Sequence, residues 1–524
     1  MNSNKKIPQI TKIFWKRTYL FIEYACEEKQ EIFVRNSNKM ISFEQKQLEN
    51  DHYRAKLNLC IAEGRQMLGS GDWSICIGEE PSMHIKEEVL ENLETLSNVF
   101  RYDNDKAYII TFHLEDHGES RVSLTLKVDY MMRNPHPKRR IDSLFILKSV
   151  LNTWYRFVCF VYKKQGNRVL FLSENREEMT GNLKALYERM IERDMEKTYK
   201  LNKSFRNIFT YRQSPLDWLK IVTKIATHDY IFVEDYVPVL GFLNLDKKTT
   251  VVQTWHAGFG FKSVGYGRFG LEGSPNPYHS CHRMYTYGLI GNDNLREIYS
   301  EVFGIEKEAL LATGMPRLSH FLDEDVIEKT RSELYEKMPS LKGKHIITFA
   351  PTYRGSNQKE AYYDMDKIDQ KQLYRFCKET DSVVLFKFHP FLKGQKLVDP
   401  AYQERLMDLS ELNLNDLFYI TDVLITDYSS CFYDYILLNK PVLFYVYDEA
   451  VYSATRGVHR PVHKVAPGKI CRTFEELMES LEKKDYTAMK APEFMIDKCL
   501  YNTEKTASDK VIDYIFLKEK DLDV

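Results

Sequence analysis

Four short apolar segments between residues 249 and 426 each lead into polar residues whose side chains could bind or transfer a phosphate. These residues are His256, Thr352 with Arg354, His389, and the run of Thr426, Asp427, Ser429 and Ser430. Imidazoles exchange protons near neutral pH, a guanidinium binds phosphate oxygens in pairs, and serine hydroxyls donate hydrogen bonds to them. This combination of side chains indicates phosphate chemistry.

The two histidines differ in what surrounds them. His256 is followed by a glycine-rich loop in which Gly258 lets the backbone approach a ligand closely, and this favours a role as general base. A lone histidine is nevertheless more often structural. Lys262, at the end of that loop, could steer an anionic acceptor or be a solvated surface lysine. His389 precedes Pro390, which favours extended backbone and suits a side chain at a strand tip.

The remaining candidates also have ordinary structural explanations. Ser429 and Ser430 open a predicted helix, SSCFYDYILL, whose N-terminus would attract a phosphate, although serine is also a common helix cap. Arg354, and Arg317 in TGMPRLSH, could bind phosphate or nucleotide, or form surface salt bridges. Asp427 could bind a metal or a ribose, but orienting its loop is the better interpretation.

Two acidic residues have a structural interpretation, and two nucleotide-binding motifs are absent from the sequence. Glu234 and Asp235, in FVEDY, are interpreted as a strand end. The sequence contains no Walker-type phosphate loop, and it has no D-x-D motif where a metal-dependent nucleotide-diphosphate enzyme would need one.

The elements that must position these residues are strands alternating with helices. From Arg168 onward, short apolar runs such as RVLFLS, DYIFVED and SVVLFKFH alternate with longer segments of helical periodicity. This alternation predicts parallel sheets covered by helices, in two units with a cleft between them. Ligands of such sheets bind beyond the carboxyl ends of the strands, where the candidate residues are expected.

The first 137 residues have a different pattern. Between residues 12 and 130, short alternating runs are separated by turn-like breaks such as RNSNK and EDHGES. Many short strands with turns between them predict an antiparallel, sandwich-like all-β accessory domain.

Residues 138–164 combine cations with bulky apolar side chains. The segment begins with Lys138, Arg139 and Arg140, and Trp154 is among its aromatic residues. Such a composition at helical spacing favours a helix lying on an anionic membrane surface. A buried helix between domains with charged ends is the alternative.

Composition limits the possible partners and location. The chain has 524 residues and a formal net charge of −1, so its overall charge does not indicate nucleic acid as a partner. Its nine cysteines are scattered without metal-type spacing, which is typical of reduced thiols in the cytoplasm. The sequence shows no secretory signal and no apolar run long enough to span a bilayer. We therefore expect a cytoplasmic protein.

Six motifs in a fixed order resemble the CDP-glycerol glycerophosphotransferase family, whose members make teichoic acids and related capsules. They are QTWHAGFGFKSVG, TGMPR, FAPTYRG, FKFHP, LITDYSS and NKPVLFYVYD, spread over residues 165–495. The N-terminal sheet region and the segment Thr180-Gly181-Asn182 resemble the ribitol-phosphate branch. The family commonly has Gly-Thr-Pro after its first histidine, whereas this chain has Ala257-Gly258-Phe259. The acceptor or polyol pocket is therefore expected to differ.

The resemblance implies a two-lobed GT-B fold and metal-independent transfer of polyol phosphate from CDP-glycerol or CDP-ribitol, with release of CMP. It implies that His256 and His389 are catalytic. Thr426 to Ser430 with Arg354 would hold the donor phosphates, and Thr352 and Arg317 would lie on the nucleotide side. Gly258 and Lys262 would lie on the acceptor side.

These expectations divide the chain into four parts. Residues 1–137 are the accessory domain, 138–164 the membrane-surface helix, 165–315 the acceptor-side lobe, and 316–524 the donor-side lobe with a C-terminal helix. The expected partners are a CDP-polyol, a lipid-linked polymer acceptor and the inner face of the cell membrane. The alternatives are a GT-B enzyme acting on a UDP-sugar and a non-catalytic protein that binds teichoic acid.

Overall fold

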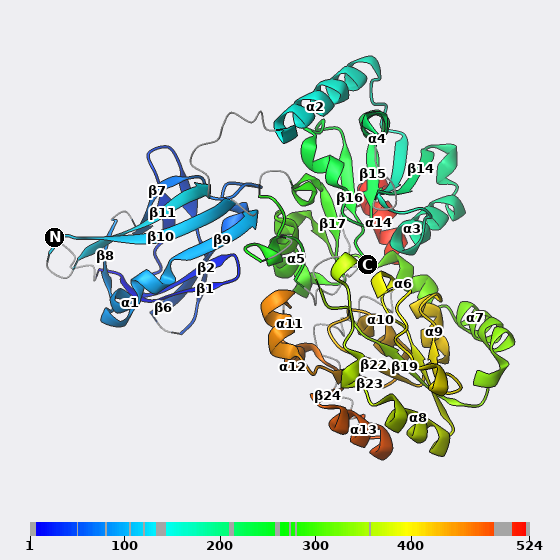
Figure 1. The fold of residues 1–524 in the computed structure, drawn as a ribbon. Helices are drawn as coiled ribbons and strands as arrows, with labels where there is room; N and C mark the ends of the chain where they lie inside the picture. The colour runs from blue at the N-terminus through cyan, green and yellow to red at the C-terminus, as the bar shows by residue number, and fades with distance from the viewer. Residues whose placement is uncertain are drawn as a thin grey trace.

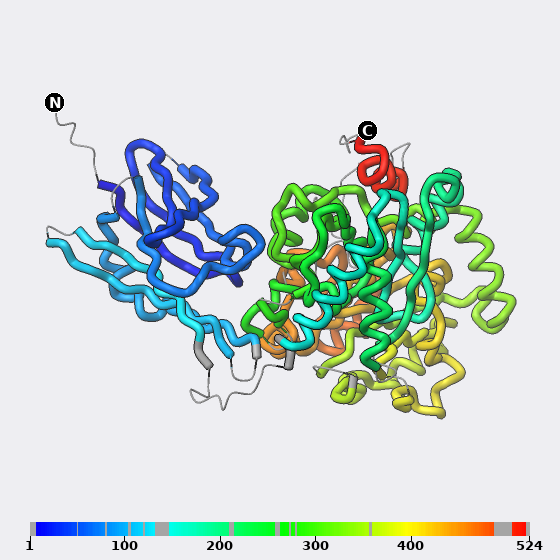
Figure 2. The backbone as a smooth tube through the Cα atoms, turned by 90° about the horizontal axis from the view of Figure 1, so that it is seen from above, coloured from blue at the N-terminus to red at the C-terminus, as the bar shows by residue number. Residues whose placement is uncertain are grey.

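The computed structural model describes residues 7–49, 51–78, 81–103, 106–118, 121–132, 143–208, 214–256, 263–271, 274–277, 280–355, 358–392, 394–458, 460–486 and 506–519. The predicted residues Lys138, Arg139, Arg140, Gly258 and Lys262 lie outside these ranges. A β-rich N-terminal region lies to one side of a larger α/β body (Figures 1 and 2).

The N-terminal region is an eleven-stranded sheet. Its elements are β1 (Gln9–Lys16), β2 (Tyr19–Ala25), β3 (Ile32–Arg35), β4 (Met40–Ser42), β5 (Glu44–Gln47), β6 (His52–Asn58), β7 (Gly71–Ile77), β8 (Ser82–Ile85), α1 (Glu87–Glu91), β9 (Asn98–Asp103), β10 (Lys106–Asp116) and β11 (Val122–Met132). The strand pairings are antiparallel except for a short parallel one between β1 and β8. Alternating apolar residues from β1, β2, β6, β7, β10 and β11 share one core.

This β region is fastened to the α/β body by aromatic and ionic contacts. Phe269 of the body belongs to the β region's core and stacks on Phe100 with ring centroids 5.2 Å apart. The Arg17 Nε donates to Glu301, a fully buried carboxylate in α5 (Arg296–Phe303), at 2.9 Å. An apolar contact joined to a buried ion pair fixes the two parts against each other.

Helix α2 (Ser143–Val161) lies along the surface of the first α/β unit (Figure 1). Its inner face buries Leu151, Tyr155 and Val158 in that unit's core. The Trp154 indole N–H donates to the Thr223 hydroxyl at 2.9 Å, so this side chain is turned toward the body.

The first lobe is built on a seven-stranded sheet in the order β13-β14-β12-β15-β16-β17-β18, parallel except for the edge strand β13. Its strands are β12 (Arg168–Ser173), β13 (Asn175–Arg176), β14 (Lys200–Asn207), β15 (Tyr230–Val233), β16 (Thr250–Gln253), β17 (Tyr287–Leu289) and β18 (Leu310–Leu311). Its helices, besides α5, are α3 (Gly181–Glu192), α4 (Pro215–Thr227) and α6 (Pro316–Phe321).

The second lobe has a six-stranded, fully parallel sheet in the order β21-β20-β19-β22-β23-β24. Its strands are β19 (His345–Ala350), β20 (Ser382–Phe386), β21 (Leu406–Asp408), β22 (Val423–Thr426), β23 (Val442–Tyr445) and β24 (Lys469–Cys471). Its helices are α7 (Glu324–Lys337), α8 (Gln370–Glu379), α9 (Leu414–Ile420), α10 (Phe432–Tyr435), α11 (Glu449–Thr455), α12 (Val462–Val465) and α13 (Phe474–Lys483). The predicted α/β class with parallel sheets is confirmed.

The C-terminal helix packs against the first lobe, which corrects its expected placement within the second. Helix α14 (Ala507–Ile512) and the turn of π-helix that follows bury apolar residues in the core beneath β12 and α3. Arg189 of α3 donates to Asp509 at 2.8 Å, and Arg193 donates to Asp513 at 2.7 Å. Buried apolar side chains and these ion pairs hold the C-terminal helix against the first lobe (Figure 1).

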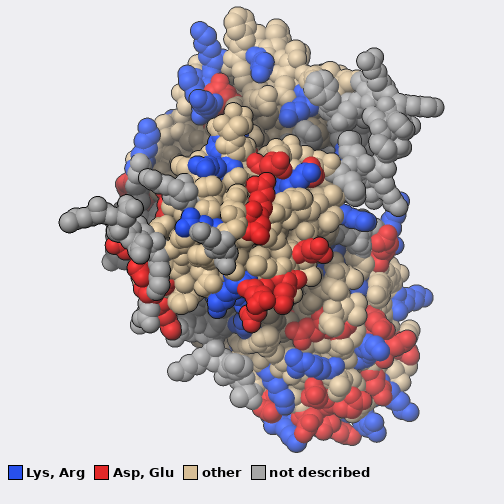
Figure 3. All heavy atoms as spheres, turned by 90° about the vertical axis from the view of Figure 1, so that its left-hand side faces the viewer, with Lys and Arg blue, Asp and Glu red and all other residues tan. Residues whose placement is uncertain are grey.

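The distribution of surface charge and the character of the helices agree with the near-zero net charge and the ordinary apolar content of the sequence. On the face that carries the β region, positive and negative side chains are interspersed (Figure 3). Within the described part of the chain, no helix has both the length and the apolar character needed to cross a bilayer. The eight cysteines in that part are free thiols.

Candidate active site

His256 and Asp235 form a hydrogen-bonded pair at the edge of the first lobe's sheet. Strands β15 and β16 run parallel with Val233 opposite Gln253, so the residues that follow the two strands meet. His256 Nδ1 lies 3.2 Å from Asp235 Oδ1, and the histidine side chain remains 47% exposed. A carboxylate at Nδ1 holds the tautomer in which Nε2 carries the lone pair that a general base requires.

The carboxylate of this pair is ionised. Burial raises the pKa of Asp235, but the hydrogen bond with His256 and the charge of Arg176 lower it more, so the pKa lies below its usual value. Arg176 Nε lies 3.2 Å from Asp235 and Arg176 Nη1 3.3 Å from Glu234. Burial dominates at Glu234 and raises its pKa. Asp235 therefore acts as the anion that orients the imidazole.

His389 lies just beyond β20, at the edge of the second lobe's sheet. Its Nδ1 accepts a hydrogen bond from the Phe391 backbone N–H at 3.2 Å. Its ring packs against Tyr353 and Phe391, with both centroid distances at 4.6 Å. An acceptor at Nδ1 places the proton on Nε2, so His389 presents a hydrogen-bond donor.

Asp427 ties together the loops that follow β19 and β22. Its Oδ1 accepts from the backbone N–H groups of Thr352, at 2.8 Å, and Tyr428, at 2.6 Å. Its Oδ2 accepts from Arg354 Nη1 at 2.8 Å. Asp427 thus orients its loop, as the sequence favoured.

Arg354 is buried and holds the same loops in place. Its Nε and Nη2 form a two-pronged contact with Asp448, at 2.7 and 2.8 Å, and Nη1 also donates to the Thr352 carbonyl. Four tyrosine rings surround the guanidinium at 5.3–5.5 Å: Tyr363, Tyr428, Tyr447 and Tyr452. Burial lowers the pKa of Arg354, but the two carboxylates raise it above its usual value. A charged Arg354 fixes the loop geometry, and its predicted contact with phosphate stays a prediction.

The threonines and serines line the same sheet edge. Thr426 Oγ1 donates to the Ala350 carbonyl at 2.8 Å, while the buried Thr352 Oγ1 has no partner among the described residues. Ser429 and Ser430 are half-buried. The helix expected to open at Ser429 begins instead at Phe432 and spans four residues, because the chain tightens into a 3-10 turn from Ile436 to Leu438. Any phosphate binding here depends on hydroxyl and backbone groups of the turn more than on a helix dipole.

Arg317 joins the two lobes. Its guanidinium forms a two-pronged ion pair with Asp434 of α10, with Nη2 2.9 Å from Oδ1. Nη2 also donates to the His256 carbonyl at 3.4 Å. Its predicted place on the nucleotide side stays a prediction, and the structure adds this contact between the lobes.

A second contact between the lobes is made by a backbone hydrogen bond. The Ser263 N–H, at the end of the His256 loop, donates to the Gly457 carbonyl at 3.3 Å. The neighbouring Arg456 donates to the Tyr353 hydroxyl at 2.9 Å and stacks on that ring, which packs against His389. The two lobes therefore contact each other at Ser263 and Gly457 as well as at Arg317 and Asp434.

Sequence reasoning missed Asp235, Asp434 and Arg456. Asp235 was interpreted as a strand end, although the rule applied to the other strands marks the carboxyl end of β15 as well. Asp434 and Arg456 occupy ordinary helical sequence, where no local motif distinguishes them. Within the described residues, no cluster of His, Cys, Asp and Glu could hold a metal ion.

Comparisons with known proteins place this chain in a family. The model of the CDP-Glycerol:Poly(glycerophosphate) glycerophosphotransferase family matches residues 153–517. The chain is 29% identical to the teichoic acid ribitol-phosphate polymerase TarL of Staphylococcus aureus, over 97% of this chain and 98% of that one. It is 32% identical to TarK of the same organism, over 71% and 72%.

A solved structure agrees in fold. The wall teichoic acid polymerase TagF is 22% identical and superposes with a TM-score of 0.55 over 71% of this chain and 94% of that one. The family match covers both parallel sheets, both histidines and the Asp427 loop, so the chain belongs to the CDP-glycerol:poly(glycerophosphate) glycerophosphotransferase family.

Proposed function

We propose that this protein extends a teichoic-acid-type polymer by transferring ribitol phosphate from CDP-ribitol, with release of CMP. A hydroxyl oxygen at the end of the polymer attacks the phosphorus that carries the ribitol. A new P–O bond forms, the P–O bond to CMP breaks, and the hydroxyl proton passes to a base. The choice of ribitol over glycerol is supported by TarL, whose similarity extends over almost the whole chain.

The observation that carries the proposal is the His256–Asp235 pair connected to the second lobe through Arg317 and Asp434. In a two-lobed GT-B arrangement, His256 takes the acceptor proton from the first lobe. His389 donates from Nε2 to the transferring phosphate, beside the hydroxyl and backbone groups of Ser429 and Ser430.

The direct test compares donors. We expect purified protein with a polyol-phosphate acceptor to release CMP from CDP-ribitol faster than from CDP-glycerol. If CDP-glycerol is the preferred donor, glycerol phosphate takes the place of ribitol phosphate in the proposal. If the protein uses a UDP-sugar and neither CDP-polyol, the proposal is overturned. We also propose that no metal ion takes part, so addition of EDTA is expected to leave the rate unchanged.

The base is tested by substitution. His256→Ala is expected to lower kcat by about 100-fold or more, because the acceptor hydroxyl loses the base that Asp235 orients. The half-buried His345, at the opposite edge of the second lobe's sheet, provides the matched control as His345→Ala. Unchanged turnover in His256→Ala would remove His256 from the mechanism.

We propose that helix α2 attaches the protein to the inner face of the cell membrane, where a lipid-linked acceptor would be extended. The outer face of α2 exposes Val150, Phe157, Phe160 and Val161, with Phe160 83% exposed. Leu216 of α4 adds a further exposed apolar side chain, which lines a cavity of about 560 Å³ formed by α4, β14 and Trp154 of α2. Exposed aromatic residues next to cations such as Arg156 suit an anionic bilayer.

Vesicle binding tests the attachment. Phe157→Asp with Phe160→Asp is expected to abolish sedimentation with phosphatidylglycerol vesicles and to leave transfer to a soluble acceptor intact. Val451→Asp, at an exposed apolar residue of the second lobe, is the control. Equal sedimentation of the double variant and the control would contradict the attachment.

A further inference from the structure

A completely buried side chain, Asn182, links the segments that determine where His256 lies. Its Nδ2 donates to the carbonyl of Thr254 at 3.2 Å and also to the carbonyl of Trp255. Its Oδ1 accepts the Arg317 backbone N–H at 3.1 Å. One amide group therefore contacts both the turn that carries the histidine and the start of α6, where the chain leaves the first lobe.

The turn depends on such support because its backbone is strained. Trp255 has a φ of 45°, in the left-handed region that bulky residues rarely adopt. Its N–H is held by Gln253 Oε1 at 2.9 Å. Asn182 supplies the donor on the carbonyl side of the same residue, so the strained peptide is fixed from both ends.

The position of Asn182 is itself closely specified. Its backbone N–H donates to Glu234 Oε1 at 2.9 Å. The preceding residue, Gly181, has a φ of 60°, and a Cβ atom there would lie 2.4 Å from the same oxygen. A side chain at this place would be strained and would press on Glu234, which gives the segment Thr180-Gly181-Asn182 a structural reason.

The link continues into the second lobe. The Arg317 backbone N–H donates to Asn182 Oδ1. The Arg317 guanidinium donates to both the His256 carbonyl and the Asp434 carboxylate. Asp434 lies in α10, directly after the Ser429–Ser430 turn, and its side chain is buried. A shift of one lobe relative to the other is therefore transmitted to the backbone of His256.

We propose that Asn182 and Arg317 are positioning residues that couple the alignment of the two lobes to the placement of His256 for proton transfer. This inference rests on the proposed function. Among the described residues, Asn182 itself contacts the His256 turn, Glu234 and the start of α6, and none of its hydrogen bonds reaches the donor-binding loops of the second lobe. Loss of its side chain should therefore affect kcat far more than KM for the donor.

Substitutions at Asn182 test the coupling. We expect Asn182→Ala to lower kcat by about tenfold to a hundredfold with little change in KM for the CDP-polyol. Asn182→Asp, which keeps the shape and the acceptor oxygen but sets a carboxylate against two carbonyls, is expected to be slower still. It serves as the second variant if the alanine form does not fold. A rise in KM with kcat unchanged in the folded variants would overturn the proposal.

A double-mutant comparison tests whether Asn182 and Arg317 act together. We expect Arg317→Ala to lower kcat, and the double variant to be about as slow as the slower single variant, because both remove the same support. Tyr419→Phe is the matched control: it removes a 2.9 Å hydrogen bond to the Phe321 carbonyl across the same lobe boundary, away from His256. The coupling would be overturned if the fold-losses in kcat of the two single variants multiplied in the double variant. It would also be overturned if Tyr419→Phe lowered kcat equally.

Hydrogen exchange separates this inference from the proposed function. In Asn182→Ala and Arg317→Ala, the backbone amides of residues 253–256 are expected to exchange faster than in the parent and in Tyr419→Phe. If the parent turns over no CDP-polyol but the exchange differs as expected, the proposed function fails and the structural link stands. Unchanged exchange in both variants overturns the link, whatever the activity.

Discussion

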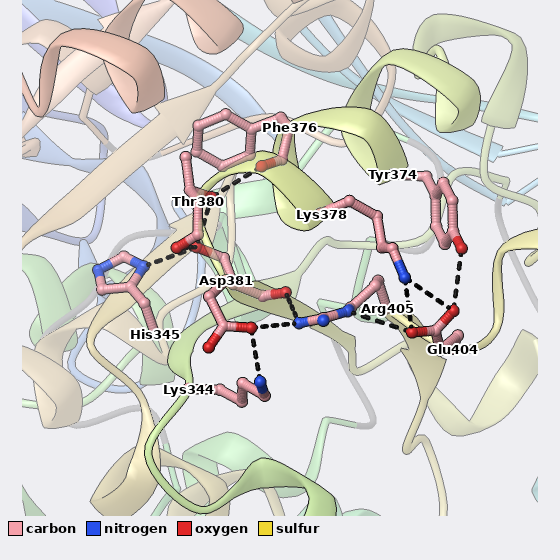
Figure 4. A network of polar contacts seen from close by, with 10 residues as sticks. Lys344, His345, Tyr374, Phe376, Lys378, Thr380, Asp381, Glu404 and Arg405 are labelled. Carbon is pink, nitrogen blue, oxygen red and sulfur yellow. Dashed lines mark hydrogen bonds and ion pairs between the residues drawn. The ribbon is translucent and has the colours of Figure 1, made fainter.

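The two edges of the second lobe's sheet carry charge networks that differ in exposure. At the amino edge, Lys344 and Arg405 pair with Asp381, and Lys378 pairs with Glu404 (Figure 4). The side chains of Asp381 and Glu404 are 60% and 59% exposed. Solvent screens such pairs, so they add little to stability.

At the carboxyl edge, the Arg354 network is buried. Arg354 and Asp427 are 7% and 2% exposed in their side chains, and their partners include backbone groups of two loops. Breaking such a network leaves an unpaired buried charge. The difference indicates that charges at the carboxyl edge determine the shape of the site, whereas charges at the amino edge are surface pairs.

The largest effect is expected from Arg354→Ala. Because Asp427 and Asp448 would lose their shared cation inside the lobe, the free energy of unfolding should fall by about 3–5 kcal/mol, with loss of CMP release. Chemical denaturation followed by circular dichroism measures the first effect. A variant with the stability of the parent would show that the two edges are equivalent.

Asp235→Asn sharpens the comparison by removing one charge from the first lobe's carboxyl edge. We expect kcat to fall by about 100-fold, because an amide no longer holds the reactive tautomer of His256. Since Arg176 also contacts Glu234, folding should be retained, and a thermal melt checks this. A rate within about twofold of the parent would contradict the orienting role.

As the pH falls, the His256–Asp235 pair should lose its stabilising effect only under strongly acidic conditions. The pKa of Asp235 lies below its usual value, so the stability from this pairing is fully present above the unfolded pKa of about 3.8 and is lost as the pH falls through the lower folded value. We expect the Asp235 carboxyl to remain ionised at pH 5. A carboxyl that protonates above pH 5 in a titration followed by infrared spectroscopy would contradict this expectation.

The smallest effect is expected from Asp381→Asn at the amino edge. Hydrogen bonds from Lys344 and Arg405 lower the pKa of Asp381, but the carboxylate is mostly exposed to solvent. The melting temperature should change by no more than about 2 °C, and CMP release should not change. A larger loss would mean that exposed pairs matter as much as buried ones here.

The sequence predicted the elements better than the contacts between them. Alternating apolar runs and helices indicated both parallel sheets, and the strand-end rule placed His256 and His389 at the carboxyl edges where they lie. The pairing of His256 with Asp235 depends on the register of β15 and β16, which neither strand's sequence specifies.

Contacts between distant parts of the chain could not be predicted from local sequence patterns for the same reason. The apolar face of α14 indicates that the helix is buried, but its composition does not distinguish the first lobe from the second. The end of a short helix is equally hard to predict, because one tightened turn reduced α10 to four residues.

The return of α14 to the first lobe means that the chain passes between the lobes twice, once between Leu311 and Glu324 and once between Lys483 and Ala507. A body attached at a single point can tilt and twist in any direction. The described residues hold these two lobes at more than one place, because Arg317 pairs with Asp434 and the Ser263 N–H donates to the Gly457 carbonyl. With α14 also anchored on the first lobe by Arg189 and Arg193, the directions in which the lobes can move against each other are restricted.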